Sequence, residues 1–137
     1  FKTAEPRVRF DLEQITGTVP IIKAYAGMGI GDGIISLLDP EKIDGVVIEA
    51  LGAGNLPPLA AREIKSLMDK GVPVVLVSRC FNGIAEPVYA YEGGGVKLQE
   101  DGVMFVKELN APKARLKLLI ALSAGLEDQE LKDYIEG

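Results

Sequence analysis

An asparagine, Asn55, follows a glycine-rich turn and is the side chain whose setting most clearly suggests a chemical role. The ten residues Glu49–Pro58 read EALGAGNLPP, with two spaced glycines before the asparagine and two prolines after it. An asparagine in this setting can cap the following helix, because its oxygen accepts backbone N–H groups and prolines are tolerated in a first helical turn. It can also contact a ligand. The local residues alone favour the capping role.

A second candidate group, Glu86, Tyr91 and Glu92, lies in the segment Arg79–Gly95, which we expect to be a long loop. Taken alone, these residues are typical of a solvated loop with some interface character. The sequence contains no histidine, which excludes Ser-His-Asp and Cys-His nucleophile systems and the usual zinc sites. Any chemistry must therefore use threonine, serine, tyrosine, lysine or carboxylates.

Three alternate glycines, Gly27, Gly29 and Gly31, follow the first predicted strand. Such a stretch can bind a phosphate through backbone N–H groups at the start of a helix. The G-x-G-x-x-G spacing of dinucleotide-binding proteins fails here, because Asp32 stands at the third glycine position and would repel a phosphate. We interpret the glycines as a tight turn.

The composition is that of one globular domain with its own core. The chain has 137 residues, 47% of them hydrophobic and 26% charged, and a net charge of −5. This charge leaves no broad basic surface, so we expect no nucleic-acid partner. No apolar run approaches the roughly 18 residues of a membrane span, so no membrane partner is expected either. The single cysteine excludes an internal disulfide and fits a reducing compartment, which favours the cytoplasm. We interpret the first residue, Phe1, as a cut end within a longer protein.

The first half of the chain alternates between strand and helix patterns. Apolar runs predict strands, and a stripe at i, i+3 and i+4 predicts an amphipathic helix that ends at Gly71. The expected elements are a strand at 18–25, a short helix at 34–38, a strand at 45–51, a helix at 59–70 and a strand at 72–78. The last strand is apolar on both faces, as in the middle of a parallel sheet.

The second half adds helices that can cover the sheet. Residues 95–106 fit either a hairpin turning at Asp101-Gly102 or a helical turn before a short strand, and we favour the latter. Asn110 suits the N-cap of a helix that ends at Gly125, and a last helix covers 128–135. We predict an α/β fold of three layers, with a parallel, flavodoxin- or Rossmann-like sheet, helices on both faces, and a linker or edge strand over 1–17.

Three segments, in this order and spacing, resemble the C-terminal domain of L-asparaginases, most closely the archaeal enzymes related to the bacterial cytoplasmic type. They span most of residues 18–125. One departure is Ala26, where the family usually has proline. The segments are Ile21–Met28 (IIKAYAGM), Gly45–Pro57 (GVVIEALGAGNLP, with the family's G-x-G-N loop), and the stretch from Gly71–Cys80 (GVPVVLVSRC) to Asn110–Lys117 (NAPKARLK).

The resemblance also implies what this chain lacks. The family's nucleophilic threonine and its Thr-Asp-Lys group lie in an N-terminal domain, in Thr-Gly-Gly-Thr and Gly-Thr-Asp-Thr motifs, and neither motif occurs here. The resemblance therefore implies that residues 1–17 are an interdomain linker, and that residues 18–137 are a C-terminal domain that holds no catalytic residue and is inactive alone. The implied partners are L-asparagine, the N-terminal domain of the same enzyme, and a second subunit in a homodimer, whose active site this domain completes.

The resemblance shifts the interpretation of Asn55 from helix capping to substrate contact, because it matches the asparagine of the G-x-G-N loop. Tyr91, which precedes Glu92-Gly-Gly94, is the best match in the second loop, followed by Glu86 and then Glu92. These groups would orient the α-amino and carboxylate ends of asparagine while a threonine attacks its side-chain amide. No metal and no organic cofactor is implied.

Two other functions remain open. One is the asparaginase-like subunit of a tRNA-dependent amidotransferase, against which the net charge of −5 argues, because an RNA partner favours basic clusters. The other is a non-catalytic flavodoxin-like binding module. A receiver domain would need paired acids after its first strand, where this chain has Ala24-Tyr25-Ala26.

Overall fold

Four parallel strands form the centre of the computed structural model, which describes residues 8–31 and 33–137. Their order in the sheet follows their order in the chain, with Ile21 level with Val47 and Val75 level with Met104. The strands are β1 (Ile21–Lys23), β2 (Val46–Ala50), β3 (Val74–Ser78) and β4 (Met104–Phe105). The predicted parallel sheet is therefore confirmed.

The two central strands are buried on both faces because nearly every residue in them is apolar. Ile48 and Leu76 point into one hydrophobic cluster, whereas Val47 and Val75 point into the other. This alternation is the two-residue period of a strand. The edge strands are shorter, and Ile21 at the free edge of β1 is exposed.

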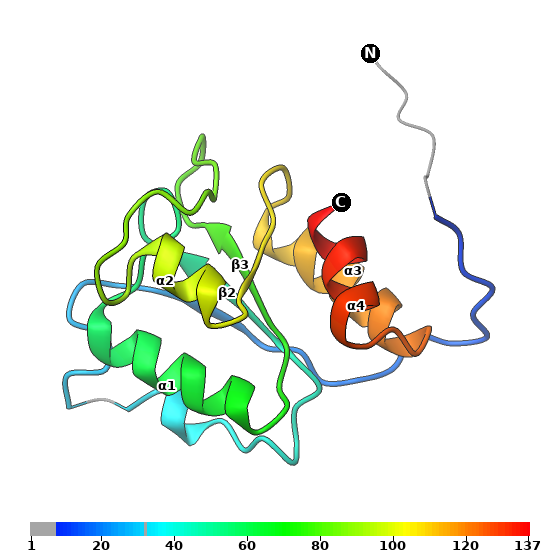
Figure 1. The fold of residues 1–137 in the computed structure, drawn as a ribbon. Coiled ribbons are helices and arrows are strands. Elements are labelled where there is room, and N and C mark those ends of the chain that lie inside the picture. Colours follow the sequence, from blue (N-terminus) through cyan, green and yellow to red (C-terminus); the bar gives the residue numbers. More distant parts are fainter. Residues whose placement is uncertain (1–7, 32) are drawn as a thin grey trace.

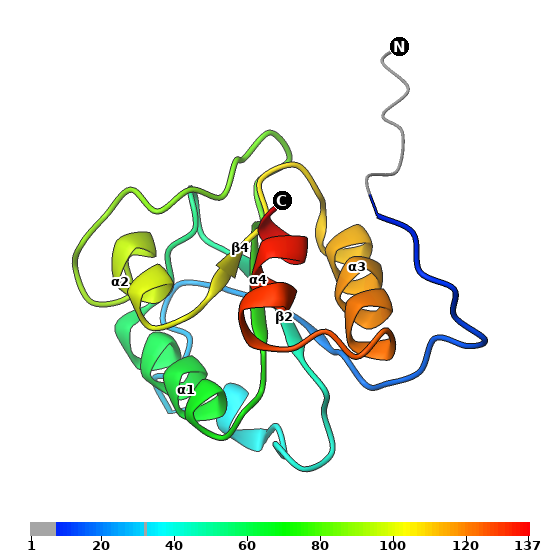
Figure 2. The same ribbon diagram turned by 45° about the vertical axis from the view of Figure 1, so that its right-hand side comes forward.

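Helices cover both faces of the sheet, as Figures 1 and 2 show. Because right-handed crossovers between sequential neighbours return on the same side, the connecting elements share one face. These are the 3-10 helix η1 (Ile35–Leu37) and the helices α1 (Pro58–Asp69) and α2 (Gly95–Glu100). The other face carries α3 (Ala111–Ser123) and α4 (Asp128–Glu136). The three-layer α/β prediction is confirmed.

Several local predictions also hold. The helical turn and short strand expected over 95–106 are α2 and β4. Asn110 is the N-cap of α3, where its side-chain oxygen accepts the Lys113 N–H at 3.1 Å. Turns occupy the glycine-rich stretch, in which the Met28 N–H donates to the Tyr25 carbonyl at 3.1 Å. Asp32, the predicted phosphate-repelling residue, lies outside the described part.

The first strand, Ile21–Lys23, is shorter than the predicted 18–25, and the chain before it also contacts α3. Thr16 exchanges two hydrogen bonds of 3.2 Å with the Ser123 hydroxyl, and Arg115 donates to the Val19 carbonyl at 2.6 Å. Residues 8–17 of the predicted linker contain no helix or strand, and residues 1–7 lie outside the described part. Across the described residues, every helix is too short or too polar to cross a membrane.

Candidate functional site

The loops that follow β1, β2 and β3 meet at one edge of the sheet, because parallel strands end on the same side. Backbone hydrogen bonds join the starts of these loops: Ala24 donates to Glu49 and Arg79 to Ala50, both at 2.8 Å. The Arg79 guanidinium also donates to the Ala24 carbonyl at 3.0 Å. The three loops are thus brought together at the carboxyl edge.

The loop after β2 is a tight turn closed on itself. Leu51 and Asn55 exchange two backbone hydrogen bonds of 2.9 Å. Within it, Gly52 and Gly54 have φ of +51° and +115°, conformations that other residues rarely adopt. A Cβ on Gly54 would also lie 2.8 Å from the Phe105 ring, so the turn needs glycine for space as well as for backbone angle.

Asn55 does not cap α1, so the capping role that local residues favoured is wrong. The N-cap of α1 is Pro57, and none of the described side chains caps it by a hydrogen bond. Instead, the Asn55 side-chain oxygen accepts the N–H of Gly95, the first residue of α2, at 3.2 Å. The physical reason is Leu56, which is buried and donates its own N–H to the Gly93 carbonyl at 2.8 Å, so the chain stays extended before α1 begins.

The loop after β3 packs closely against the Asn55 turn at Gly93, where a Cβ would overlap the Leu56 carbonyl oxygen. Gly94 is needed within the loop after β3 itself, because a Cβ there would overlap the Tyr89 carbonyl oxygen. The Glu86 N–H donates to the Ala53 carbonyl at 2.8 Å. We call the combined surface of residues 51–57 and 79–95 the interlocked loops.

Tyr91 is exposed over 56% of its surface, and its ring lies 5.8 Å from that of Tyr89, centroid to centroid. The backbone beneath it is fixed, because its carbonyl accepts the Gly94 N–H at 2.7 Å. Asn55 and Tyr91 therefore lie on loops that hydrogen bonds and close packing hold together.

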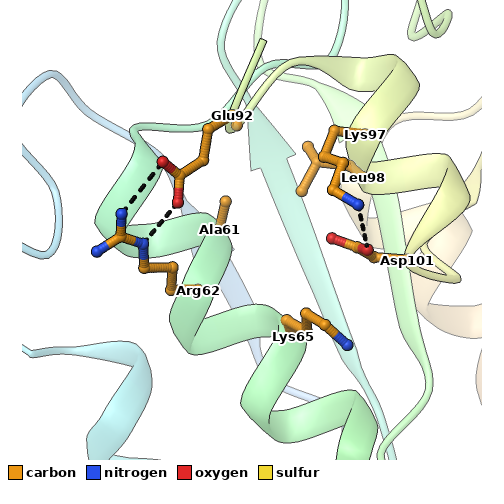
Figure 3. Close-up of a pocket in the computed structure, with 8 residues that line it drawn as sticks. Ala61, Arg62, Lys65, Glu92, Lys97, Leu98 and Asp101 are labelled. Carbon is orange, nitrogen blue, oxygen red and sulfur yellow. Dashed lines mark hydrogen bonds and ion pairs between the residues drawn. The ribbon is translucent and has the colours of Figure 1, made fainter. Parts of the chain in front are cut away.

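Both carboxylates of the second loop are paired with cations. Glu86 accepts a hydrogen bond from the Lys107 ammonium at 2.9 Å, and both groups are largely exposed. Glu92 pairs with Arg62 of α1 through two hydrogen bonds (Figure 3). The hydrogen bond from Arg62 lowers the pKa of Glu92 below its ordinary value, and the charge of Arg62 acts in the same direction against the opposing effect of burial.

Sequence reasoning missed Arg62, Lys107 and Gly95 as parts of this region. Gly95 closes a run of three glycines, and that run was a usable signal for close backbone approach. The two cations lie on other elements, and their pairing with the loop depends on tertiary structure. The described residues contain no group of three or more His, Cys, Asp or Glu placed to hold a metal ion.

These observations define an α/β domain with a parallel sheet and a glycine-rich candidate site at its carboxyl edge. A family model described as the glutaminase/asparaginase C-terminal domain matches residues 18–135. A Deinococcus radiodurans protein named a probable L-asparaginase is 43% identical over 132 residues, which cover 96% of this chain and 39% of that protein.

Two further proteins are similar to this chain. A Pyrococcus furiosus protein, named as one of the subunits of glutamyl-tRNA(Gln) amidotransferase, is 31% identical over 132 residues, 96% of this chain and 29% of that protein. The crystal structure of L-asparaginase I from Vibrio cholerae superposes with a TM-score of 0.75 and 26% identity, over 98% of this chain and 40% of that one.

The chain therefore belongs to the glutaminase/asparaginase C-terminal domain family. It spans about two fifths of the length of its Deinococcus relative. The resemblance drawn from the three sequence segments is confirmed, and the flavodoxin-like binding module loses its support.

Proposed function

We propose that this chain is the C-terminal domain of an L-asparaginase, which hydrolyses L-asparagine to L-aspartate and ammonia. The observation that carries the proposal is the pair of interlocked loops at the carboxyl edge, in a chain whose residues 18–135 match the family model. In this proposal the interlocked loops complete the active site of a homodimer partner. The N-terminal domain supplies the nucleophilic threonine, and the chain alone is inactive.

Asn55 is the residue whose geometry is best suited to a hydrogen bond with the substrate. Its oxygen is occupied by the Gly95 N–H, so its amide nitrogen is the group left to act as a hydrogen-bond donor. A donor of this kind suits the substrate's carboxylate. Tyr91 offers an exposed hydroxyl on the neighbouring loop. Glu86 offers a carboxylate for the α-amino group, although it must then share or exchange its contact with Lys107.

The task of the interlocked loops would be orientation. When the loops hold the α-amino and carboxylate ends of the substrate, its side-chain amide carbon lies within reach of the threonine oxygen. That oxygen attacks the amide carbon, and ammonia leaves. Water then releases aspartate from the resulting ester. We place the enzyme in the cytoplasm, a proposal supported by the single, exposed thiol of Cys80, since reducing compartments preserve such groups.

A second candidate is the asparaginase-like subunit of a tRNA-dependent amidotransferase, favoured by the 31% identity to the Pyrococcus protein. The asparaginase proposal is better supported, because the identity to the Deinococcus protein is 43% over the same number of residues. The net charge of −5 also disfavours an RNA partner. Ammonia release from free asparagine in the absence of tRNA favours the asparaginase, whereas transfer of that ammonia to glutamyl-tRNA favours the amidotransferase subunit.

The direct test measures ammonia release by the chain alone and by the chain joined to its N-terminal domain, here called the complete enzyme. We expect no turnover by the chain and turnover of L-asparagine by the complete enzyme. An inert complete enzyme would refute the proposal.

Asn55→Asp tests the role of the side chain, because aspartate keeps the oxygen acceptor for Gly95 but loses the donor. In the complete enzyme we expect kcat/KM to fall about tenfold or more. Asn110→Asp is the matched control, since it makes the same change in charge at a helix cap. Normal kinetics for Asn55→Asp would remove Asn55 from the site.

A further inference from the structure

An ion pair between Arg62 and Glu92 ties the loop that carries Tyr91 to helix α1. The Arg62 guanidinium meets the Glu92 carboxylate in a two-point contact, with Nε 2.5 Å from Oε1 and Nη2 3.1 Å from Oε2. Such bidentate pairing fixes orientation as well as distance, because both groups are planar. Figure 3 shows the Arg62 side chain turned from α1 toward Glu92 on the loop.

Arg62 and Glu92 line a small groove, and the other two cations of this groove pair with neighbours along their own helices. Lys65 contacts Asp69 at 3.2 Å along α1, and Lys97 contacts Asp101 at 3.2 Å at the end of α2. Of the three cations that line the groove, Arg62 alone is paired with the loop after β3. It is therefore the groove cation through which α1 can act on that loop.

The ion pair adds a side-chain contact to a loop whose residues 79–94 contain no helix or strand and are held by scattered backbone hydrogen bonds. Glu92 lies between Tyr91 and Gly93, whose carbonyl accepts the Leu56 N–H beside Asn55. The ion pair and this hydrogen bond hold adjacent residues, so the two contacts together set where Tyr91 stands relative to the Asn55 turn.

We propose that Arg62 is a positioning residue, which holds the segment that carries Tyr91 against the Asn55 turn through its ion pair with Glu92. The inference rests on the proposed asparaginase function. It also gives Glu92 a role other than contact with substrate, because both of its oxygens are engaged by Arg62.

The exposure of the pair decides which measurement will detect it. The Arg62 and Glu92 side chains are 65% and 51% exposed, and exposed ion pairs contribute little to global stability. Local opening of a loop is governed by far fewer contacts, so the same pair has a larger share in it. Loss of the pair should therefore loosen the loop and leave the melting temperature nearly unchanged.

The first experiment measures amide hydrogen exchange of residues 87–95 in the chain itself. In Arg62→Gln and in Glu92→Gln we expect exchange about threefold faster, and in the exchanged pair Arg62→Glu with Glu92→Arg we expect it restored. Salt at about 0.5 M should speed exchange in the unmutated chain and not in the single variants, because it screens the pair. Lys65→Gln, which breaks the neighbouring ion pair with Asp69, should leave the exchange rates of residues 87–95 unchanged.

The second experiment measures kinetics in the complete enzyme. The single variants should raise KM for L-asparagine about fivefold and change kcat less than twofold, because a looser loop weakens binding of ground state and transition state alike. The exchanged pair should recover KM. If Glu92 instead contacts the substrate directly, the exchanged pair should not recover KM, because arginine then stands where the substrate needs a carboxylate.

Exchange rates unaltered in both single variants would overturn the proposed role of Arg62, and so would faster exchange combined with an unaltered KM. An unmutated complete enzyme that is inert toward asparagine would refute the proposed function instead. The exchange experiment does not depend on activity, so the two failures are distinguishable.

Discussion

Two segments of this chain share the pattern Asn-x-Pro, and they fold differently. At Asn110-Ala111-Pro112 the helix begins directly after the asparagine, which caps it. At Asn55-Leu56-Pro57 the helix begins at Pro58, and the asparagine binds a residue 40 positions away. In both cases the same side-chain oxygen accepts one backbone N–H.

The residue after the asparagine explains the difference. Leu56 donates its N–H to Gly93 of the neighbouring loop, which holds the chain extended past Asn55. Ala111 enters α3 at once and packs into the core. A capping pattern in the sequence thus identifies a side chain that can accept a backbone N–H. Tertiary contacts determine which N–H donates to it. The cap at Asn110 is a local contact, whereas the hydrogen bond between Asn55 and Gly95 forms only when two distant loops meet.

The largest expected effect comes from separating those loops. Gly93→Ala would push a Cβ into the Leu56 carbonyl at a φ of +86°, and we expect a loss of about 3 kcal/mol or more in the free energy of unfolding. Gly71→Ala is the matched control, with a φ of +89° and open space around it, and should cost about 1 kcal/mol. Urea unfolding at constant m measures both. Equal losses would mean that backbone angle, and not loop contact, sets the cost.

Asn55→Ala should have the next largest effect. It leaves the N–H of Gly95 without its acceptor in a partly buried position, at a cost of about 2 kcal/mol. Asn55→Asp keeps the acceptor and should cost clearly less. The same urea titration measures both variants. If alanine and aspartate destabilise equally, the hydrogen bond to Gly95 contributes nothing.

Asn110→Ala should cost about 1 kcal/mol, the usual value for a lost N-cap. The position is exposed, so water can replace the side-chain oxygen at the Lys113 N–H. The ratio of the losses in the free energy of unfolding for Asn55→Ala and Asn110→Ala compares a long-range hydrogen bond with a local cap. A cost at Asn110 above that at Asn55 would reverse the comparison.

The smallest expected effect is a pH dependence confined to the Asn55 region. The pKa of Glu92 is lowered by the hydrogen bond from Arg62, so the ion pair is intact above the ordinary value of 4.5 and is lost as the pH falls through the lowered pKa. Exchange protection of the Gly95 N–H, corrected for intrinsic rates, should fall in that range. Protection of the Lys113 N–H should not fall in this pH range. The Arg62→Gln variant should lose the pH dependence at Gly95.

The sequence predicted the sheet and helices well, because their signals are local. The apolar runs of β2 and β3 and the stripe of Ile64 and Leu67 on α1 each follow one periodicity. Asn110 was predicted correctly for the same reason. The interlocked loops were not predictable in this way, because Asn55 with Gly95 and Arg62 with Glu92 are pairs that only the folded chain brings together.

The contacts between the segment before β1 and helix α3 have a consequence for biosynthesis. Thr16 donates a backbone hydrogen bond to the Ser123 hydroxyl, and the Val19 carbonyl accepts one from Arg115. Each hydrogen bond therefore joins a residue synthesised early to one synthesised late. On the ribosome the amino-terminal residues emerge first, and domains fold as their parts become available. The segment around β2, α1 and β3 can assemble while translation continues, but Thr16 and Val19 must wait for α3. The hydrogen bonds of Thr16 and Val19 to α3 therefore form only after most of the domain has been synthesised.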